Sequence, residues 1–312
     1  MYAYIIRRLW QMIPTILGVI VLVFILFNWV GGDPAYVLAG KISNQEQIDN
    51  IRRQLGVDQP WWVQLWIFIK QVLTADFGAS WSTNEQVSNI LATRLGPSLT
   101  VVVPLTILDA LLSIALALAV AYVRGSLTDR MVMIVCTVGL SISILVYIIV
   151  FQYFFAYKLG WFPVQGWGDS FRENLILYSS LPILILLVVS IAPNLRLYRT
   201  FFLDEINQDY VRTARAKGLS ENRIMWLHVL RNASIPIITN LMANLPGLLL
   251  GAFLIERFFS IPGIGREVIL AVERSDFPVI KALTVYVAFA TVASNLLADL
   301  MYKAADPRVQ LK

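Results

Sequence analysis

Six long segments with almost no charged residues constrain the fold of this chain more than any other feature of its sequence. The chain is 58% hydrophobic and 14% charged, whereas a soluble domain of similar length carries about a quarter charged residues. Each segment has at least the roughly 20 residues that a helix needs to cross the hydrocarbon core of a bilayer. The sequence therefore predicts an all-α polytopic membrane protein with six transmembrane helices, at residues 9–30, 97–123, 131–157, 175–195, 233–255 and 282–302.

Lysine and arginine indicate the orientation of these helices. With the N-terminus inside, the inner loops carry about twice the density of basic residues of the outer loops, in agreement with the positive-inside rule. We therefore expect both termini in the cytoplasm, in a multi-pass protein of the inner (cytoplasmic) membrane. The net charge of +5 follows from this loop placement and does not indicate a nucleic-acid partner. The first segment follows Arg7 and Arg8, and its length favours a retained anchor over a cleaved signal peptide.

The predicted helices divide the chain into three parts. These are an N-terminal transmembrane helix (1–30), an outer loop (31–96), and a core transmembrane domain (97–312) with two short inner helices within 204–231. In the outer loop, Ser43 and Glu46 have the spacing of a capping box, which marks the start of a helix. Gly56 can end that helix, and Pro60 can open a second one. We predict two short amphipathic helices there. Tryptophans suited to a membrane–water interface follow: Trp61, Trp62 and Trp66.

A polar, mostly basic stretch interrupts the hydrophobic pattern between the fourth and fifth segments. It reads DYVRTARAKGLSENRIMWLHVLRNASIP, at residues 209–236. A helix over 204–217 is expected to end at Gly218, which accepts a positive φ without a Cβ clash. Ser220 can cap a second helix, with Glu221 in its first turn. We predict that these two helices, called here the knuckle (residues 204–231), form a bent, rigid unit that docks into another protein. The alternative is an amphipathic helix on anionic lipid, whereas a segment tethered to two spans could hardly reach a nucleic-acid duplex.

Several motifs together carry a resemblance to a known family. The polar stretch contains YVRTARAKGLS followed by LRNASIP. The others, in chain order, are YIIRRLWQMIPTILGVIVLVFILF with GGDP at 31–34, LGVDQPWWVQ at 55–64, DFGASW at 76–81, FFSIPGIGREV at 258–268, RSDFPVI at 274–280 and ADPRVQ at 305–310. In this order they resemble, over nearly the whole chain, the permease subunits of ATP-binding-cassette (ABC) importers, in the dipeptide, oligopeptide and nickel branch. The short N-terminus and the long first outer loop resemble the first of the two paralogous permeases of such systems.

The resemblance implies a fold, partners and a docking site. It implies the type I importer permease fold, with a second permease, two ATPase subunits, and a periplasmic or lipid-anchored substrate-binding protein as partners. It also implies that residues 210–219 insert into a groove on an ATPase subunit. The implied docking residues are Tyr210, Arg212, Thr213, Ala214, Arg215, Ala216, Lys217, Gly218 and Leu219.

This chain departs from the general form of the family's coupling motif. That motif is E-A-A followed by three residues and a glycine. With its glycine at Gly218, Arg212 stands at the position of the glutamate and Thr213 at that of the first alanine. The later I-x-L-P element falls on residues 228–231, which read HVLR. The peptide branch shares the RTARAKG variant. We therefore do not expect in this chain a salt bridge that depends on that glutamate.

Motifs for catalysis are missing from the sequence. There is no G-x-x-x-x-G-K-[ST], since Gly40-Lys41 lacks the upstream glycine and the following hydroxyl. There is no H-E-x-x-H or G-x-S-x-G, and the only histidine is His228. We expect a transport component rather than an enzyme, with no cofactor or metal on this chain and with ATP and Mg²⁺ bound by partner ATPases.

Polar residues inside the predicted spans are candidates for a substrate path, because exposing them to lipid is costly. They are Asp109, Asn240, Asn244, Asn295 and Asp299. For Asp109 a purely structural, hydrogen-bonded role remains open, and Asp299 lies near the cytoplasmic end of its span. A short peptide is the expected substrate, with nickel, a metallophore complex or an oligosaccharide as alternatives. A secondary transporter remains as a more distant alternative.

Overall fold

The computed structural model describes residues 2–30, 34–39 and 44–305. These residues form helices and loops, with one isolated bridge between Ala79 and Gln86, so the all-α class is confirmed. The chain divides into two compact units, residues 1–97 with 262–293 and residues 98–261 with 294–312. Most of the GGDP and ADPRVQ motifs lies outside the described residues.

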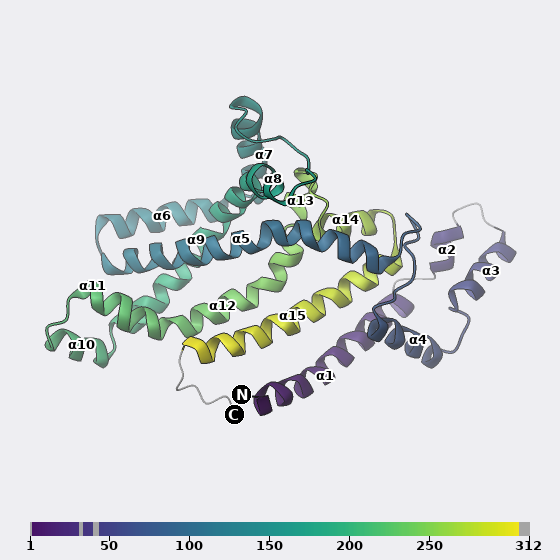
Figure 1. The fold of residues 1–312 in the computed structure, drawn as a ribbon, viewed down its shortest axis with the longest axis horizontal. Coiled ribbons are helices and arrows are strands. Elements are labelled where there is room, and N and C mark those ends of the chain that lie inside the picture. Colours follow the sequence, from purple (N-terminus) through teal and green to yellow (C-terminus); the bar gives the residue numbers. More distant parts are fainter. Residues whose placement is uncertain (1, 31–33, 40–43, 306–312) are drawn as a thin grey trace. The chain divides into compact units, whose positions relative to one another are not determined.

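The first unit contains the N-terminal helix, the outer-loop helices and a late short helix (Figure 1). Their bounds are α1 Tyr2–Ile25 with the π-helical η1 Leu26–Val30, α2 Pro34–Ala39, α3 Gln45–Leu55, α4 Trp61–Thr74 and α14 Ile264–Glu273. The long helices α5 (Val87–Tyr122) and α15 (Phe277–Ala305) contribute residues to both units. Phe24 and Phe68 are buried in the hydrophobic core of the first unit.

The outer-loop helices form as predicted, with a different first cap. Asn44 and Gln47 make the capping box of α3, in which the Asn44 N–H donates to Gln47 Oε1 (3.3 Å); the predicted partner Ser43 lies outside the described residues. Gly56 ends α3 in the left-handed region (φ 67°) and Pro60 precedes α4, as expected. The tryptophans of α4 are exposed, as an interface helix requires: Trp61, Trp62 and Trp66. The additional helix α2 was not predicted.

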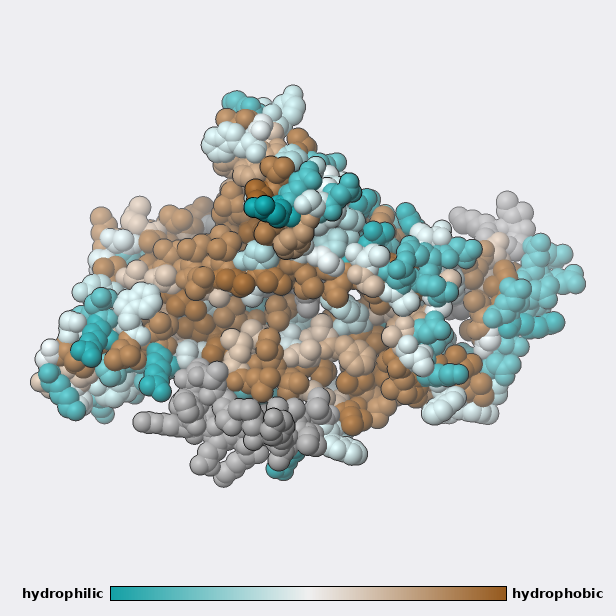
Figure 2. Space-filling view, in the orientation of Figure 1, coloured by the Kyte–Doolittle hydropathy of each residue, from teal (hydrophilic) through white to brown (hydrophobic). Residues whose placement is uncertain are grey.

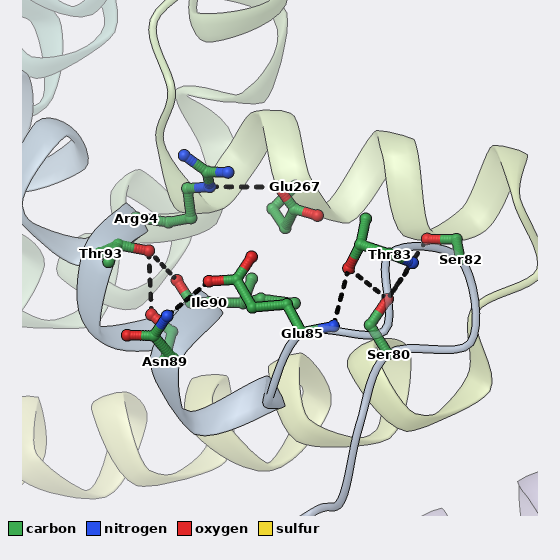
Figure 3. Close-up of polar contacts among 9 residues, drawn as sticks. All are labelled: Ser80, Ser82, Thr83, Glu85, Asn89, Ile90, Thr93, Arg94 and Glu267. Carbon is green, nitrogen blue, oxygen red and sulfur yellow. Dashed lines mark hydrogen bonds and ion pairs between the residues drawn. The ribbon is translucent and has the colours of Figure 1, made fainter.

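A buried carboxylate holds the DFGASW loop in the first unit. Asp276 is 1% exposed and accepts hydrogen bonds from Ser80 Oγ (2.5 Å), Ser82 Oγ (2.9 Å), and the N–H groups of Trp81 (3.1 Å) and Ser82 (3.2 Å). In the same loop, Thr83 donates to Ser80 Oγ from its N–H and its hydroxyl (Figure 3). Burial raises the pKa of Asp276, but these donors outweigh burial and leave it below its ordinary value.

We expect Asp276→Asn to lower the free energy of unfolding by about 2–3 kcal/mol at neutral pH, because four donors lose a charged acceptor. Since the folded-state pKa is lowered, the carboxylate stabilises the fold above the unfolded pKa of about 3.9 and loses this effect as pH falls through the folded pKa. The melting temperatures of the unchanged protein and of the variant in detergent should therefore differ at pH 7 and differ less in acid. Asp49→Asn, in a half-exposed pair with Arg52, is the control. A difference in melting temperature that does not change with pH would contradict this explanation.

The second unit packs helices around two hydrophobic clusters. One cluster surrounds Tyr198 and Phe202, and the other surrounds Ile148 and Ile185. Helix α9 contacts α6, α7 and α12 (Figure 1). The remaining bounds are α6 Leu127–Ser141, α7 Ile144–Phe151, η2 Gln152–Lys158, α8 Phe171–Glu173, η3 Asn174–Tyr178, α9 Ser180–Ile206, α10 Asp209–Ala216, α11 Glu221–Arg223, η4 Ile224–Val229, α12 Leu230–Gly251 and α13 Phe253–Phe258.

The described residues contain four helices that are long and apolar enough to cross a membrane. They are Trp10–Asn28, Val87–Tyr122, Ser180–Ile206 and Phe277–Tyr302. Leu127–Ser141 and Ile144–Lys158 could form a fifth span together, although they are bent by 94°. Helix α12, which contains most of the predicted fifth span, is not among them. The count of six and the position of the termini thus stay predictions.

The helix predicted at 131–157 is not continuous, because the chain turns between α6 and α7. Ile142 is extended (φ −92°, ψ 130°), and Ser143 Oγ caps the new helix by accepting from the Leu145 N–H (3.3 Å). The Tyr147 hydroxyl donates to the Gly139 carbonyl (3.0 Å). This bond joins the two helices across the bend and fixes it.

Candidate functional site

The polar stretch at 209–236 folds as the predicted knuckle, with one more break than expected. The continuous helix predicted over 204–217 is wrong, since α9 ends at Ile206 and α10 begins at Asp209. Gly218 follows α10 with φ 78°, as predicted. The Gly218 N–H donates to the Arg215 carbonyl (2.9 Å), and the Leu219 N–H donates to that of Ala214 (3.3 Å). These two bonds are the Schellman motif, which fixes the direction in which the chain leaves α10.

A forked ion pair closes the turn after α10. Arg215 Nε and Nη2 donate to the two carboxylate oxygens of Glu221 (2.6 and 3.1 Å). Ser220 takes the N-cap position of α11 without a capping side-chain bond. The hydrogen bond from Arg215 lowers the pKa of Glu221 and the one to Glu221 raises that of Arg215, so both stay charged at neutral pH. The planar fork orients α10 against α11.

The inner side of α10 is anchored in the core of the second unit. Val211 is 0% and Ala214 is 6% exposed. Ala214, one of the implied docking residues, therefore packs against the chain's own core. The Tyr210 hydroxyl donates to Glu205 (2.5 Å) at the end of α9. Burial and this acceptor raise the pKa of Tyr210 to about 12, so the hydroxyl remains a donor at physiological pH.

The outer side of α10 is an exposed polar surface. Arg212, Thr213, Ala216 and Lys217 are exposed, and hydrophilic side chains gather over α10 and α11 (Figure 2). Arg212 lies 3.3 Å from Asp209 in an exposed pair, which solvent screens. The knuckle is thus rigid on its inner side and open on its outer side, as a docking element requires.

A pocket of about 420 Å³ lies among the helices of the second unit. It contains three of the predicted substrate-path residues: Asp109, Asn240 and Asn244. Asn295 is exposed and Asp299 is buried, and neither lines this pocket.

Asp109 is the centre of a hydrogen-bond network in this pocket. It is 6% exposed and accepts from the hydroxyls of Ser113 (3.1 Å) and Ser190 (2.8 Å) and from Asn194 Nδ2 (2.7 Å). All three donors are neutral side chains, and two of them, Ser190 and Asn194, also line the pocket.

The pocket is also lined by amides from α12. Asn240 Oδ1 accepts from the Tyr198 hydroxyl (3.2 Å) and from Asn244 Nδ2 (3.2 Å). Sequence reasoning missed Ser190, Asn194 and Tyr198, although the i,i+4 spacing of Ser190 and Asn194 places them on one face of α9. The pocket therefore combines a carboxylate, amides and hydroxyls with an apolar lining.

Comparison with known proteins matches this architecture over its whole length. Residues 110–311 match the family described as "Binding-protein-dependent transport system inner membrane component", and residues 1–102 match the N-terminal region of such components. The chain belongs to this family, and it is a permease component of an ABC importer. It is therefore a multi-pass protein of the inner membrane.

Curated relatives agree with the family. The chain is 36% identical over 312 residues to proteins named "Glutathione transport system permease protein GsiC" of Salmonella paratyphi A and Salmonella typhimurium. It is 34% identical to the protein of the same name in Escherichia coli K12. In each case the match covers 100% of both chains. Membership of this family implies ATPase and binding-protein partners.

Proposed function

We propose that this chain forms half of the translocation pore of an importer for short peptides, paired with a paralogous permease. A binding protein delivers the substrate, and two separate ATPase subunits bind ATP and Mg²⁺ and drive the switch between inward- and outward-facing states. The observation that carries the proposal is the rigid knuckle with an exposed polar surface, in a chain of this family. Residues 210–219 dock on an ATPase and transmit its movement as a rigid body.

A peptide substrate is supported by the relatives and by the chemistry of the pocket. The relatives are named for the transport of glutathione, which is itself a tripeptide. Asp109 and the amides of Asn240 and Asn244 offer a partner for an ammonium group and for peptide bonds. Nickel, a metallophore complex or an oligosaccharide stays the alternative cargo.

The proposal is tested by reconstituting the purified permease pair with its ATPases and binding protein in vesicles. ATP-dependent accumulation of labelled glutathione or trialanine is the expected result. Accumulation that needs an ion gradient instead of ATP would support a secondary transporter and contradict the proposal. Accumulation of nickel or an oligosaccharide, but of no peptide, would correct the substrate alone.

We further propose that the Asp109 pocket lies on the substrate path. Asp109→Asn conserves volume and removes the charge, so kcat/KM for a peptide with a free amino terminus is expected to fall about tenfold, as for the loss of one charge-assisted hydrogen bond. The N-acetylated peptide should be unaffected. A lowered melting temperature with unchanged kcat/KM would instead assign Asp109 the structural role.

A matched pair of asparagines provides the control for this experiment. Asn244 lines the pocket and Asn295 is exposed outside it. Asn244→Ala should reduce uptake more than Asn295→Ala. The opposite order would place the path on the face of α15 instead.

A further inference from the structure

A second pocket, in the first unit, contains a lysine that has no acidic partner among the described residues. The pocket has a volume of about 300 Å³ and is called here the Lys281 pocket. Its eighteen lining residues include Lys281, Gln54, Gln71 and Asn28, and no aspartate or glutamate. Six of the eighteen are aromatic: Phe24, Phe27, Phe68, Phe77, Trp81 and Phe277. The volume is at the lower end of the range for sites that bind small molecules.

The Lys281 ammonium is held by aromatic rings rather than by an anion. Nζ lies 5.8 Å from the centroid of Phe27 and 5.9 Å from that of Phe68, within the range of cation–π contacts. Across the part of the chain that the structure describes, no carboxylate lies within ion-pair distance of it. A partly buried cation without a counter-ion favours binding an anion from outside the chain.

The carboxylate that precedes α15 in the chain is already hydrogen-bonded. Asp276 precedes α15, but its oxygens accept four hydrogen bonds from Ser80, Trp81 and Ser82. Asp76 lies next to a lining segment, and its Oδ1 accepts from the Gly78 N–H (3.1 Å). The DFGASW loop thus uses both carboxylates to shape the wall beside Lys281 and leaves the lysine charge uncompensated.

Amide groups supply further donors. Gln64 is fixed in place, because Nε2 donates to the carbonyls of Val57 (3.0 Å) and Gln59 (2.7 Å) while its oxygen accepts from Asn28 Nδ2 (2.7 Å). Gln54 and Gln71 line the pocket and, within the described residues, their side chains have no hydrogen-bond partner. One cation with two uncommitted amides is a donor set that suits a carboxylate.

We propose that the Lys281 pocket binds a carboxylate of the transported substrate, with Lys281 as the counter-ion and Gln54 and Gln71 as neutral donors. This inference rests on the proposed function, because it takes a short peptide as the substrate and places residues 31–96 on the outer side, where substrate arrives. The volume of the pocket admits the end of a peptide. It therefore selects for a free carboxyl terminus.

The test compares Lys281→Gln with the unchanged chain in the complete importer, reconstituted with its binding protein and ATP. The probes are two pairs that differ in one carboxylate: trialanine against trialanine amide, and glutathione against its glycyl ethyl ester. KM for the free acids is expected to rise about tenfold in the variant, as for the loss of one charge-assisted bond. KM for the amide and the ester should stay unchanged. Binding of each probe to the isolated binding protein is measured separately, since the variant cannot alter it.

Two further variants exclude a merely structural role for Lys281. Lys281→Cys, in a Cys136→Ala background, should lose the preference for the free acid and regain it when the thiol is modified with a methanethiosulfonate that carries an ethylammonium group. The sulfonate-bearing reagent should not restore it. Lys158→Gln is the matched control, because Lys158 also lies over an aromatic ring (5.6 Å from Phe154) but is exposed and outside the pocket.

The outcomes separate this inference from the proposed function and from lipid binding. If the unchanged importer takes up neither peptide, the proposed function fails and the inference fails with it. If it takes up the peptides and Lys281→Gln preserves the ratio of KM values, the inference alone is overturned. If the variant slows both members of each pair equally, and only in vesicles with phosphatidylglycerol, the ligand is a lipid phosphate and the substrate carboxylate is excluded.

Discussion

Replacing Gly218 with valine is expected to reduce ATP-driven uptake by about tenfold or more. Gly218 has φ 78°, a conformation that costs an L-residue about 1–2 kcal/mol and a β-branched residue more. The strain is relieved by breaking the two Schellman bonds to Ala214 and Arg215, so α10 loses its fixed direction. ATP hydrolysis by the complex and uptake, measured in the same vesicles, should then become uncoupled, while insertion and assembly are retained.

Gly218→Asn separates strain from the mere addition of a side chain. Asparagine tolerates the left-handed region better than valine, and a Cβ at Gly218 meets no heavy atom within 4 Å. This variant should therefore keep most of the uptake. Equal uptake by all three proteins would count heavily against a coupling role for the knuckle, and equal loss in both variants would indicate a steric clash with the partner instead.

Replacing Asp129 with asparagine is expected to cause the largest loss of stability, about 3–5 kcal/mol. Asp129 is 5% exposed, and Arg199 Nε and Nη2 donate to its two oxygens, each at 2.8 Å. The Gly125 N–H also donates to Asp129 (2.9 Å). Asparagine leaves the charge of Arg199, whose side chain is only 18% exposed, without its counter-ion. The melting temperature in detergent should fall clearly.

Two controls identify the buried charge as the cause. Asp209→Asn removes the same kind of pair with Arg212, but both side chains are exposed (94% and 73%), so no measurable change in melting is expected. The double variant Asp129→Asn with Arg199→Gln should be more stable than the sum of the single losses, because no unpaired charge remains. Additive losses would contradict this explanation.

Local chemistry made much of the fold predictable from the sequence. The apolar runs located the long helices, and Gly56 and Gly218 ended helices where a positive φ was expected. Errors arose where two local signals competed. Asn44 rather than Ser43 was found to cap α3, and the extended Ile142 with the Ser143 cap broke an apolar run that reads as one helix. Hydropathy averages over such a break and does not reveal it.

Pairing between distant residues could not be predicted from one sequence. Asp109 was identified from the sequence, because exposing a carboxylate to lipid costs free energy. Its partners in α9, Ser190 and Asn194, lie more than eighty positions away along the chain and were not identified. The docking motif was predicted residue by residue, whereas the burial of Ala214 was not, since it depends on how α10 packs against the core. Lys281 was not identified at all, because a single lysine at a span end is ordinary for a membrane protein.

The central claim, that the knuckle links this permease to ATPase subunits, is tested most directly by purifying the tagged chain from its native membrane in a gentle detergent. Mass spectrometry of the co-purified proteins then identifies its partners. We predict a second permease and one or two cassette ATPases. A chain that purifies alone or only with itself, and still moves solute without ATP, would contradict the coupling account and favour a secondary transporter.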